Sequence, residues 1–185
     1  MPLNVANDEV FIVDYDKNWA MAFQEERNLI LSTCKSFVLE IEHIGSTAIP
    51  NQKAKPIVDM MMAVDSLESV KALLEQLDRI EYQIVETGMK DRIFLRKHSD
   101  AENIQFFHLH IVEKSSWKNR SERILRNYLC KHSNAVEEYG KLKERLAKQF
   151  SDDVLAYTKS KTEFIQNLMN NACDDLRMPR VDVWE

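Results

Sequence analysis

A single aspartate interrupts the most apolar stretch of this 185-residue chain. The run Ile57-Val-Asp-Met-Met-Met-Ala-Val64 contains only one charged side chain and follows Pro50 and Pro56. A continuous apolar run of this length is typical of a β-strand that is covered on both faces. A charge in such a strand is costly unless it is paired or binds a ligand. The run therefore predicts a buried strand and makes Asp59 the first candidate for a functional residue.

The composition indicates a globular chain without the commonest nucleotide-binding loops. Hydrophobic residues make up 44% of the sequence, enough for one domain with a core. The only glycines are Gly45, Gly88 and Gly140, too few and too scattered for a dinucleotide fingerprint or a Walker loop. Three widely spaced cysteines favour a reducing compartment. No apolar stretch has the length of a membrane span, and the first residues do not resemble a signal peptide, so we expect a cytoplasmic protein without a membrane partner.

The charge is unevenly distributed. The net charge of −5 argues against general nucleic-acid binding. Yet residues 90–97 contain four Lys or Arg against one acid, and residues 114–131 contain six against one. Either these segments are solvated faces, or they attract an anionic ligand to one side of an acidic body.

Hydrophobic periodicity predicts strands mixed with helices, followed by helices alone. Alternating or continuous apolar stretches favour strands over 9–15, 37–44, 57–64, 82–86, 93–96 and 106–113. Helical spacing favours helices over 19–31 and 67–80, the second started by Asp65 and Glu68 as a capping pair. From residue 115 to 176 the pattern is helical, with new helices starting near Ser133 and Ser151. We therefore expect the α+β class, with a mixed sheet and flanking helices over 1–113, a helical subdomain packed on it over 114–178, and a tail over 179–185.

Two histidines share one face of the strand expected over 106–113. Strand alternation places His108 and His110 on the same side, about 7 Å apart. Such a pair can hold one divalent metal or one phosphate, or it can be two polar residues on a solvated sheet face. Together with Asp59 the histidines have the composition of a facial triad for iron or zinc.

The turn after the strand expected over 37–44 suits a phosphate group. Gly45 allows a close approach of the backbone, and Ser46 and Thr47 add hydroxyls to unpaired backbone N–H groups. His43 either orients this turn or is a core residue, and we favour the structural role.

The sequence around this turn resembles the GrpB-like family, a branch of the nucleotidyltransferase superfamily with the DNA polymerase beta type of fold. The likeness rests on Glu42-His-Ile-Gly-Ser-Thr-Ala-Ile-Pro50, Ala54-Lys-Pro-Ile-Val-Asp59 and His108-Leu-His-Ile-Val112, and it extends along most of the chain. It implies a nucleotidyltransferase-like mixed sheet with flanking helices. Enzymes of the superfamily use two divalent metals held by a pair of carboxylates one residue apart and by a third on a later strand.

The chain departs from that pattern at the metal ligands. Met61 stands where the second carboxylate is expected, and a thioether is a poor ligand for magnesium. The third position falls near His108 and His110, so the resemblance implies a metal site of Asp59, His108 and His110. The candidate cofactors are Mg²⁺, Mn²⁺ and Zn²⁺. Asn51 also replaces a glycine that is usual in the family.

The leading hypothesis is a protein that binds a nucleotide or another phosphorylated small molecule together with a divalent metal. The expected phosphate-binding residues are Gly45, Ser46, Thr47, Lys55, Arg92 and Lys161. The residues expected to take part in any catalysis are Ser46, Asp59, His108 and His110. Two alternatives stay open: a binding module without catalysis, and a metal-dependent hydrolase or oxygenase that uses the two histidines and the aspartate.

Overall fold

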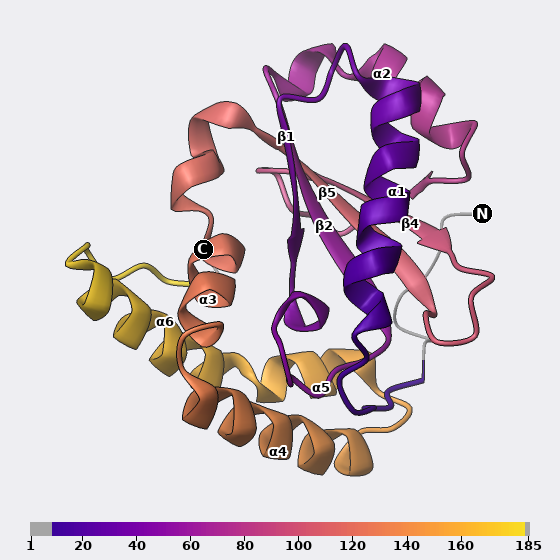
Figure 1. The fold of residues 1–185 in the computed structure, drawn as a ribbon. Coiled ribbons are helices and arrows are strands. Elements are labelled where there is room, and N and C mark those ends of the chain that lie inside the picture. Colours follow the sequence, from indigo (N-terminus) through magenta and orange to yellow (C-terminus); the bar gives the residue numbers. More distant parts are fainter. Residues whose placement is uncertain (1–8, 184–185) are drawn as a thin grey trace.

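A five-stranded mixed sheet forms the centre of the protein (Figure 1). The structure is a computed structural model and describes residues 9–183. The strand order is β1-β2-β5-β4-β3, in which only β2 and β5 run parallel. The strands are β1 (Glu40–Ile44), β2 (Ile57–Val64), β3 (Gln83–Ile84), β4 (Ile93–His98) and β5 (Phe106–Glu113). The α+β class is confirmed, and the apolar run is a strand with a neighbour on each side.

The two faces of β2 bury different side chains, as strand alternation predicts. Val58, Met60 and Met62 lie in the main core, which α1 (Asn18–Cys34) and α2 (Lys71–Asp78) cover. On the other face, Met61 packs in a smaller cluster with Trp117 of the short helix η4 (Lys114–Asn119). Asp59 belongs to this second face, which therefore carries the candidate site.

All regular elements after β5 are helical, as the periodicity predicts. The helices α4 and α5 cross beneath the end of the sheet at which β1 finishes, and α3 and α6 lie to one side (Figure 1). Within residues 9–183, no helix combines the length and the hydrophobicity that crossing a membrane requires. The division of the chain at residue 113 stays a prediction. These helices are α3 (Ser121–Leu129), α4 (Ser133–Gln149), α5 (Val154–Ser160) and α6 (Thr162–Leu176).

The segment 9–15 is not a strand of the sheet, and this prediction was wrong. Val13 makes one isolated bridge with Ala54, and Val10 packs in a cluster with α4 and α5. Val10 and Ile12 therefore pack against the helical part, whereas Phe11 and Val13 are exposed. Residues 184 and 185 of the expected tail lie outside the described residues.

The predicted helix starts are shifted by a few residues. Ser66, not Asp65, accepts a hydrogen bond from the N–H of Glu68, in the short helix η3 (Leu67–Ser69) that precedes α2. Asp153, two residues after Ser151, caps α5 by accepting from the N–H of Ala156 at 2.9 Å. Helix α4 does begin at Ser133, but no side chain caps its first residues. Both corrected caps are one to two residues from the expected ones because several capping residue types stand in a row.

Much of the basic segment 114–131 is paired with acids inside the protein. Arg123 and Arg126 of α3 each place a guanidinium nitrogen 2.7 Å from a carboxylate oxygen of Glu42 on β1. Arg120 pairs with Asp91 in the same way, in the loop before β4. These arginines thus join the helical part to the sheet and are not an open anion-binding surface.

The bond between Glu42 and the two arginines should contribute to stability above the pH at which Glu42 becomes protonated. Burial opposes ionisation of Glu42, but the two guanidinium groups hold its pKa below the ordinary value of 4.5. A depressed carboxylate pKa stabilises the fold at neutral pH, and this stabilisation is lost as pH falls below about 4.5. We expect Glu42→Gln to lower the free energy of unfolding by about 1–2 kcal/mol at pH 7.

Urea unfolding at pH 7 and at pH 3 measures this effect. The difference between the wild type and Glu42→Gln should shrink at the lower pH. Glu40→Gln is the matched control, because the pair of Glu40 with Lys114 is 41–47% exposed and should contribute less than about 0.5 kcal/mol. An equal loss in both variants would contradict the assignment.

Candidate functional site

The end of β1 lies directly against the carboxylate of Asp59. Gly45 has φ 69° and ψ −173°, a conformation that L-residues rarely adopt. A Cβ atom at this position would lie 2.4 Å from Oδ2 of Asp59. Only glycine therefore fits here, and the short helix η2 (Ser46–Ala48) starts immediately beside the carboxylate.

Asp59 is paired with His108 on the adjacent strand. The two residues are directly opposite each other in the parallel register of β2 and β5, and Oδ1 lies 3.1 Å from Nδ1 of His108. Burial opposes ionisation, but the hydrogen bond and charge of His108 and the charge of Lys55 hold the pKa of Asp59 below its ordinary value. Because the carboxylate only accepts, Nδ1 carries the donated proton. The buried Nε2 of His108 has no hydrogen-bond partner within residues 9–183.

His110 lies on the same face, beside Phe94 and near the charges of Asp59 and Arg92. Burial lowers its pKa to about 4, so the imidazole is neutral. The ring of Phe94 lies 4.8 Å from that of His110 and 5.0 Å from that of His108. In the described part of the chain, no three His, Cys, Asp or Glu side chains are grouped so as to hold a metal ion. Asp59, His108 and His110 therefore do not fit the metal site that the resemblance implied.

Thr47 faces into the protein, not the site. Its hydroxyl donates to the carbonyl oxygen of Ile57 at 2.9 Å and lies 3.0 Å from Nε2 of His43. Since the single hydroxyl proton is used, His43 must donate from Nε2. Burial lowers the pKa of His43 to about 4, and its ring stacks on Phe23. His43 is thus bonded to the turn through Thr47 as well as stacked on Phe23, and the contacts of Thr47 occupy the hydroxyl that was expected to bind phosphate.

A lysine that the sequence analysis missed lies at the centre of the site. Lys143 of α4 is 2% exposed, and its Nζ lies 2.9 Å from Oγ of Ser46, a residue 97 positions earlier in the sequence. Its ammonium nitrogen also lies 4.4 Å from the centre of the Tyr139 ring. The sequence does indicate that this lysine is buried, because it lies on the apolar stripe of α4. Lys143 follows Val136 and Tyr139 on that stripe and precedes Leu146.

Lys161 and Lys55 add two further amines. Lys161 lies between α5 and α6, with its Nζ 4.1 Å from the centre of the Tyr157 ring. Burial lowers the pKa of Lys161 to about 7; the positive charge of Lys55 acts in the same direction and Asp59 opposes it. The structure therefore brings together Gly45, Ser46, Asp59, Lys55 and Lys161, as expected.

Arg92 does not join this group of amines. Its guanidinium pairs with Asp91 and with Glu122 of α3, and its side chain is 12% exposed. The single positive charge of the arginine is thus paired with two carboxylates of the fold. The expected phosphate-binding role of Arg92 conflicts with this arrangement.

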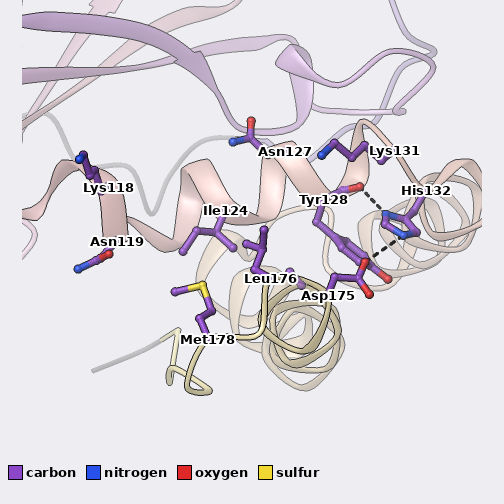
Figure 2. A pocket seen from close by; sticks show the side chains of 11 residues that line it. Lys118, Asn119, Ile124, Asn127, Tyr128, Lys131, His132, Asp175, Leu176 and Met178 are labelled. Carbon is purple, nitrogen blue, oxygen red and sulfur yellow. Dashed lines mark hydrogen bonds and ion pairs between the residues drawn. The ribbon is translucent and has the colours of Figure 1, made fainter.

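A hollow lies between α3 and α6, and none of the expected site residues lines it. It encloses about 370 Å³, and Figure 2 shows His132 at one end, between Tyr128 and Asp175. His132 Nδ1 lies 2.7 Å from the carbonyl oxygen of Tyr128, and Nε2 lies 3.3 Å from Oδ2 of Asp175. This hollow is separate from the site around Asp59.

The mixed sheet, the glycine-serine turn and the aspartate on the neighbouring strand define a nucleotidyltransferase-like fold. In agreement, the structure superposes on the Cid1 poly(U) polymerase bound to MgATP with a TM-score of 0.52. The two are 14% identical, and the match covers 84% of this chain and 51% of the polymerase chain. At this identity the likeness concerns the fold alone.

The chain belongs to the GrpB family, whose family model, described as "GrpB protein", matches residues 9–171. The crystal structure of the conserved protein GrpB from Enterococcus faecalis superposes with a TM-score of 0.79 at 31% identity, covering 90% of this chain and 99% of that one. The UPF0157 protein YqkA of Bacillus subtilis is 34% identical over 165 residues, which are 89% of this chain. The match covers 47% of YqkA, so the chain spans about half the length of that relative.

The close contact of Gly45 with Asp59 predicts that an alanine is tolerated far less at this position than at Gly88. Both glycines have positive φ, 69° and 76°, but nothing lies within 4 Å of a Cβ atom at Gly88. We expect Gly88→Ala to lower the free energy of unfolding by about 1 kcal/mol, the cost of the backbone conformation alone. Gly45→Ala should cost at least about 2 kcal/mol more, because the added methyl group overlaps the carboxylate.

Chemical denaturation of the two variants measures the difference. The double variant Gly45→Ala, Asp59→Ala should recover part of the loss, since it removes the overlapping oxygen. Equal stabilities of Gly45→Ala and Gly88→Ala would show that the predicted contact does not form.

Proposed function

We propose that this protein binds a nucleotide or another phosphorylated small molecule where the end of β1 meets α4, α5 and α6. The observation that supports this most is Lys161, a half-buried lysine whose charge is disfavoured by burial and by Lys55. No ion pair with an acid is seen for Lys161 in the described part of the chain. A bound phosphate would supply the missing negative charge and restore full protonation of Lys161.

The proposed binding groups surround the turn at Gly45. Gly45 allows a close approach of the ligand, and the Ser46 hydroxyl supplies a hydrogen bond. Lys55 and Lys161 supply positive charge, and Asp59, directly beside Gly45, can accept a hydrogen bond from a ligand hydroxyl. A clustered set of lysines is suited to phosphate, which lysine binds as a point charge.

The fold supports the same ligand class. The Cid1 polymerase that superposes on this chain is described as bound to MgATP. This is an argument by analogy, because one fold can carry unrelated functions. We therefore propose binding, and keep the module without catalysis as the alternative to a nucleotidyltransferase. Since Asp59, His108 and His110 do not fit a three-ligand group, we do not extend the proposal to a metal-dependent hydrolase or oxygenase.

The cysteine content and the ligand class together suggest where the protein works. We propose a cytoplasmic location, where nucleotides are available and free thiols stay reduced. The described cysteines are all free thiols.

Removing the amine of Lys161 should weaken ATP binding. We expect Lys161→Met to raise the Kd for ATP at least about tenfold at pH 6.5, the loss of one charge-assisted contact. Lys141→Met is the matched control, because Lys141 is 70% exposed and pairs with Glu137 on the surface of α4. Isothermal titration calorimetry, with and without Mg²⁺, measures both. The proposal fails if the wild type does not bind ATP, or if the two variants bind equally.

ATP affinity should also fall as pH rises through neutrality. The free protein holds the pKa of Lys161 at about 7, so the amine loses its charge above that pH unless ATP is bound. Binding therefore takes up a proton at pH 7 to 8, and affinity decreases by at most about tenfold per pH unit. Lys161→Arg keeps its charge throughout and should flatten this dependence. An affinity that is constant from pH 6 to 9 in the wild type would contradict the prediction.

A further inference from the structure

Ser46 and Lys143 form a buried contact that phosphate binding alone does not require. Nζ of Lys143 lies 2.9 Å from Oγ of Ser46, in a position that is almost fully buried. A buried lysine is ordinarily paired with a carboxylate, because an isolated charge is costly away from water. Within residues 9–183 no acid makes an ion pair with Lys143, so its one hydrogen-bond partner there is an alcohol.

The charged groups around Lys143 favour its neutral form. Burial lowers its pKa well below the ordinary value, and the positive charge of Lys161 lowers it further. Asp59 acts in the opposite direction but less strongly. Tyr139, on the same helix, stays a neutral hydroxyl because burial raises its pKa. More distant charge comes from Lys55, which faces Lys161. An uncharged amine has a free lone pair and can accept a proton.

Ser46 is held on two sides. Besides the contact with Lys143, the hydroxyl of Ser46 interacts with that of Tyr139, an interaction that lowers the pKa of Tyr139. A serine oxygen has one proton and two lone pairs. When the amine of Lys143 is neutral, its lone pair can accept the serine proton across the 2.9 Å contact between Nζ and Oγ. This orientation is the one in which a base removes the proton of a nucleophile.

We propose that Ser46 is a nucleophile and that Lys143 is its general base. Oγ of Ser46 forms a bond to a phosphorus atom of a bound phosphoanhydride as its proton passes to Nζ of Lys143. The bond from that phosphorus to the leaving phosphate breaks, and the leaving group departs with the electron pair. The product is a phosphate ester of Ser46, and the ammonium of Lys143 can return its proton to the leaving group. A serine activated by a lysine is a known variant of the serine-histidine arrangement.

The identity of the electrophile rests on the proposed function, whereas the assignment of Ser46 as a nucleophile does not. The phosphoanhydride would be the nucleoside triphosphate that the neighbouring Lys161 and Lys55 help to bind. The pairing of Ser46 with Lys143 can therefore be tested without any nucleotide.

Diisopropyl fluorophosphate tests the nucleophile directly. Attack by Ser46 forms the same oxygen-phosphorus bond and releases fluoride, while Lys143 takes the proton. We expect the full chain to take up one equivalent of the probe, located at Ser46 by peptide mass spectrometry. Ser46→Ala should abolish this label.

Two substitutions of Lys143 separate a base from a mere hydrogen-bond donor. Lys143→Arg keeps a positive charge and a hydrogen-bond donor but cannot act as a base. Lys143→Met removes the charge, the donor and the base. Both should label at least about 10²-fold more slowly than the wild type, the usual contribution of a general base. Lys141→Met, on the exposed side of the same helix, should label at the wild-type rate. Thermal unfolding checks that each variant is folded.

The pH profile of the wild type keeps the test decisive even if the variants of Lys143 do not fold. With a neutral amine as base, labelling should already be fast near pH 7 and level off, instead of rising in proportion to hydroxide. Labelling at another residue, an unaffected rate in Lys143→Arg, or a rate proportional to hydroxide would each overturn the inference.

A separate measurement of ATP binding distinguishes a failure of the inference about Ser46 and Lys143 from a failure of the proposed function. If the wild type binds ATP but Ser46 does not label, the inference about the nucleophile is wrong and the proposed function stands. If Ser46 labels but ATP does not bind, the proposed ligand class is wrong and the activated serine stands. If both hold, incubation with ATP and analysis of the intact mass should show a nucleotidyl or phosphoryl group on Ser46.

Discussion

Buried charge at one junction is the constraint on which the rest of this structure depends. Lys143 is buried, and Lys161 and Asp59 are half-buried, where the end of β1 meets the helical part. Removing ions from water costs several kcal/mol each unless partners compensate. The cores on both sides of the sheet and the Glu42 bonds to α3 offset this cost by holding the two parts of the chain together. A fold that carries such an unfavourable group of charges is suited to a ligand that neutralises it.

The central strand and its aspartate were predictable because their signals are local. An apolar run with one charge specifies a strand with two covered faces, and alternation alone assigns Asp59 and Met61 to the same side. The pairing of Asp59 with His108 needed one further fact, the parallel register of β2 and β5. The turn at Gly45 was also found from sequence, since only three glycines are available and this one follows a strand.

The positions of Arg92 and Lys143 relative to the site were not predictable, because they depend on partners far away in sequence. Arg92 lies in a basic segment, yet Glu122 of a later helix takes up its charge. Lys143 looks like an ordinary lysine until α4 is placed against Ser46, 97 positions earlier. Periodicity identifies the buried stripe of a helix but not what faces it. Thr47 shows the same limit at short range, because its hydroxyl turns toward Ile57 and His43.

The departures from the superfamily pattern are concentrated around the same junction. Met61 replaces a metal-binding carboxylate and packs in the small core with Trp117. Asn51 stands where the family usually has glycine and adopts a left-handed φ of 63°, which asparagine tolerates better than most residues. The turn geometry is thus kept while a metal ligand is absent. This combination is consistent with our proposal that amines, and not a metal pair, recognise the phosphate.

The pKa of Lys161 in solution tests the central claim most directly. Nuclear magnetic resonance of ¹³C at the Cε atoms of the lysines, followed from pH 5 to 11 with Lys161→Arg as the assignment variant, measures it. A value near 7 in the free protein that rises when ATP is added is the result that this account predicts. A value near 10.5, the ordinary value for lysine, that is unchanged by ATP would contradict it.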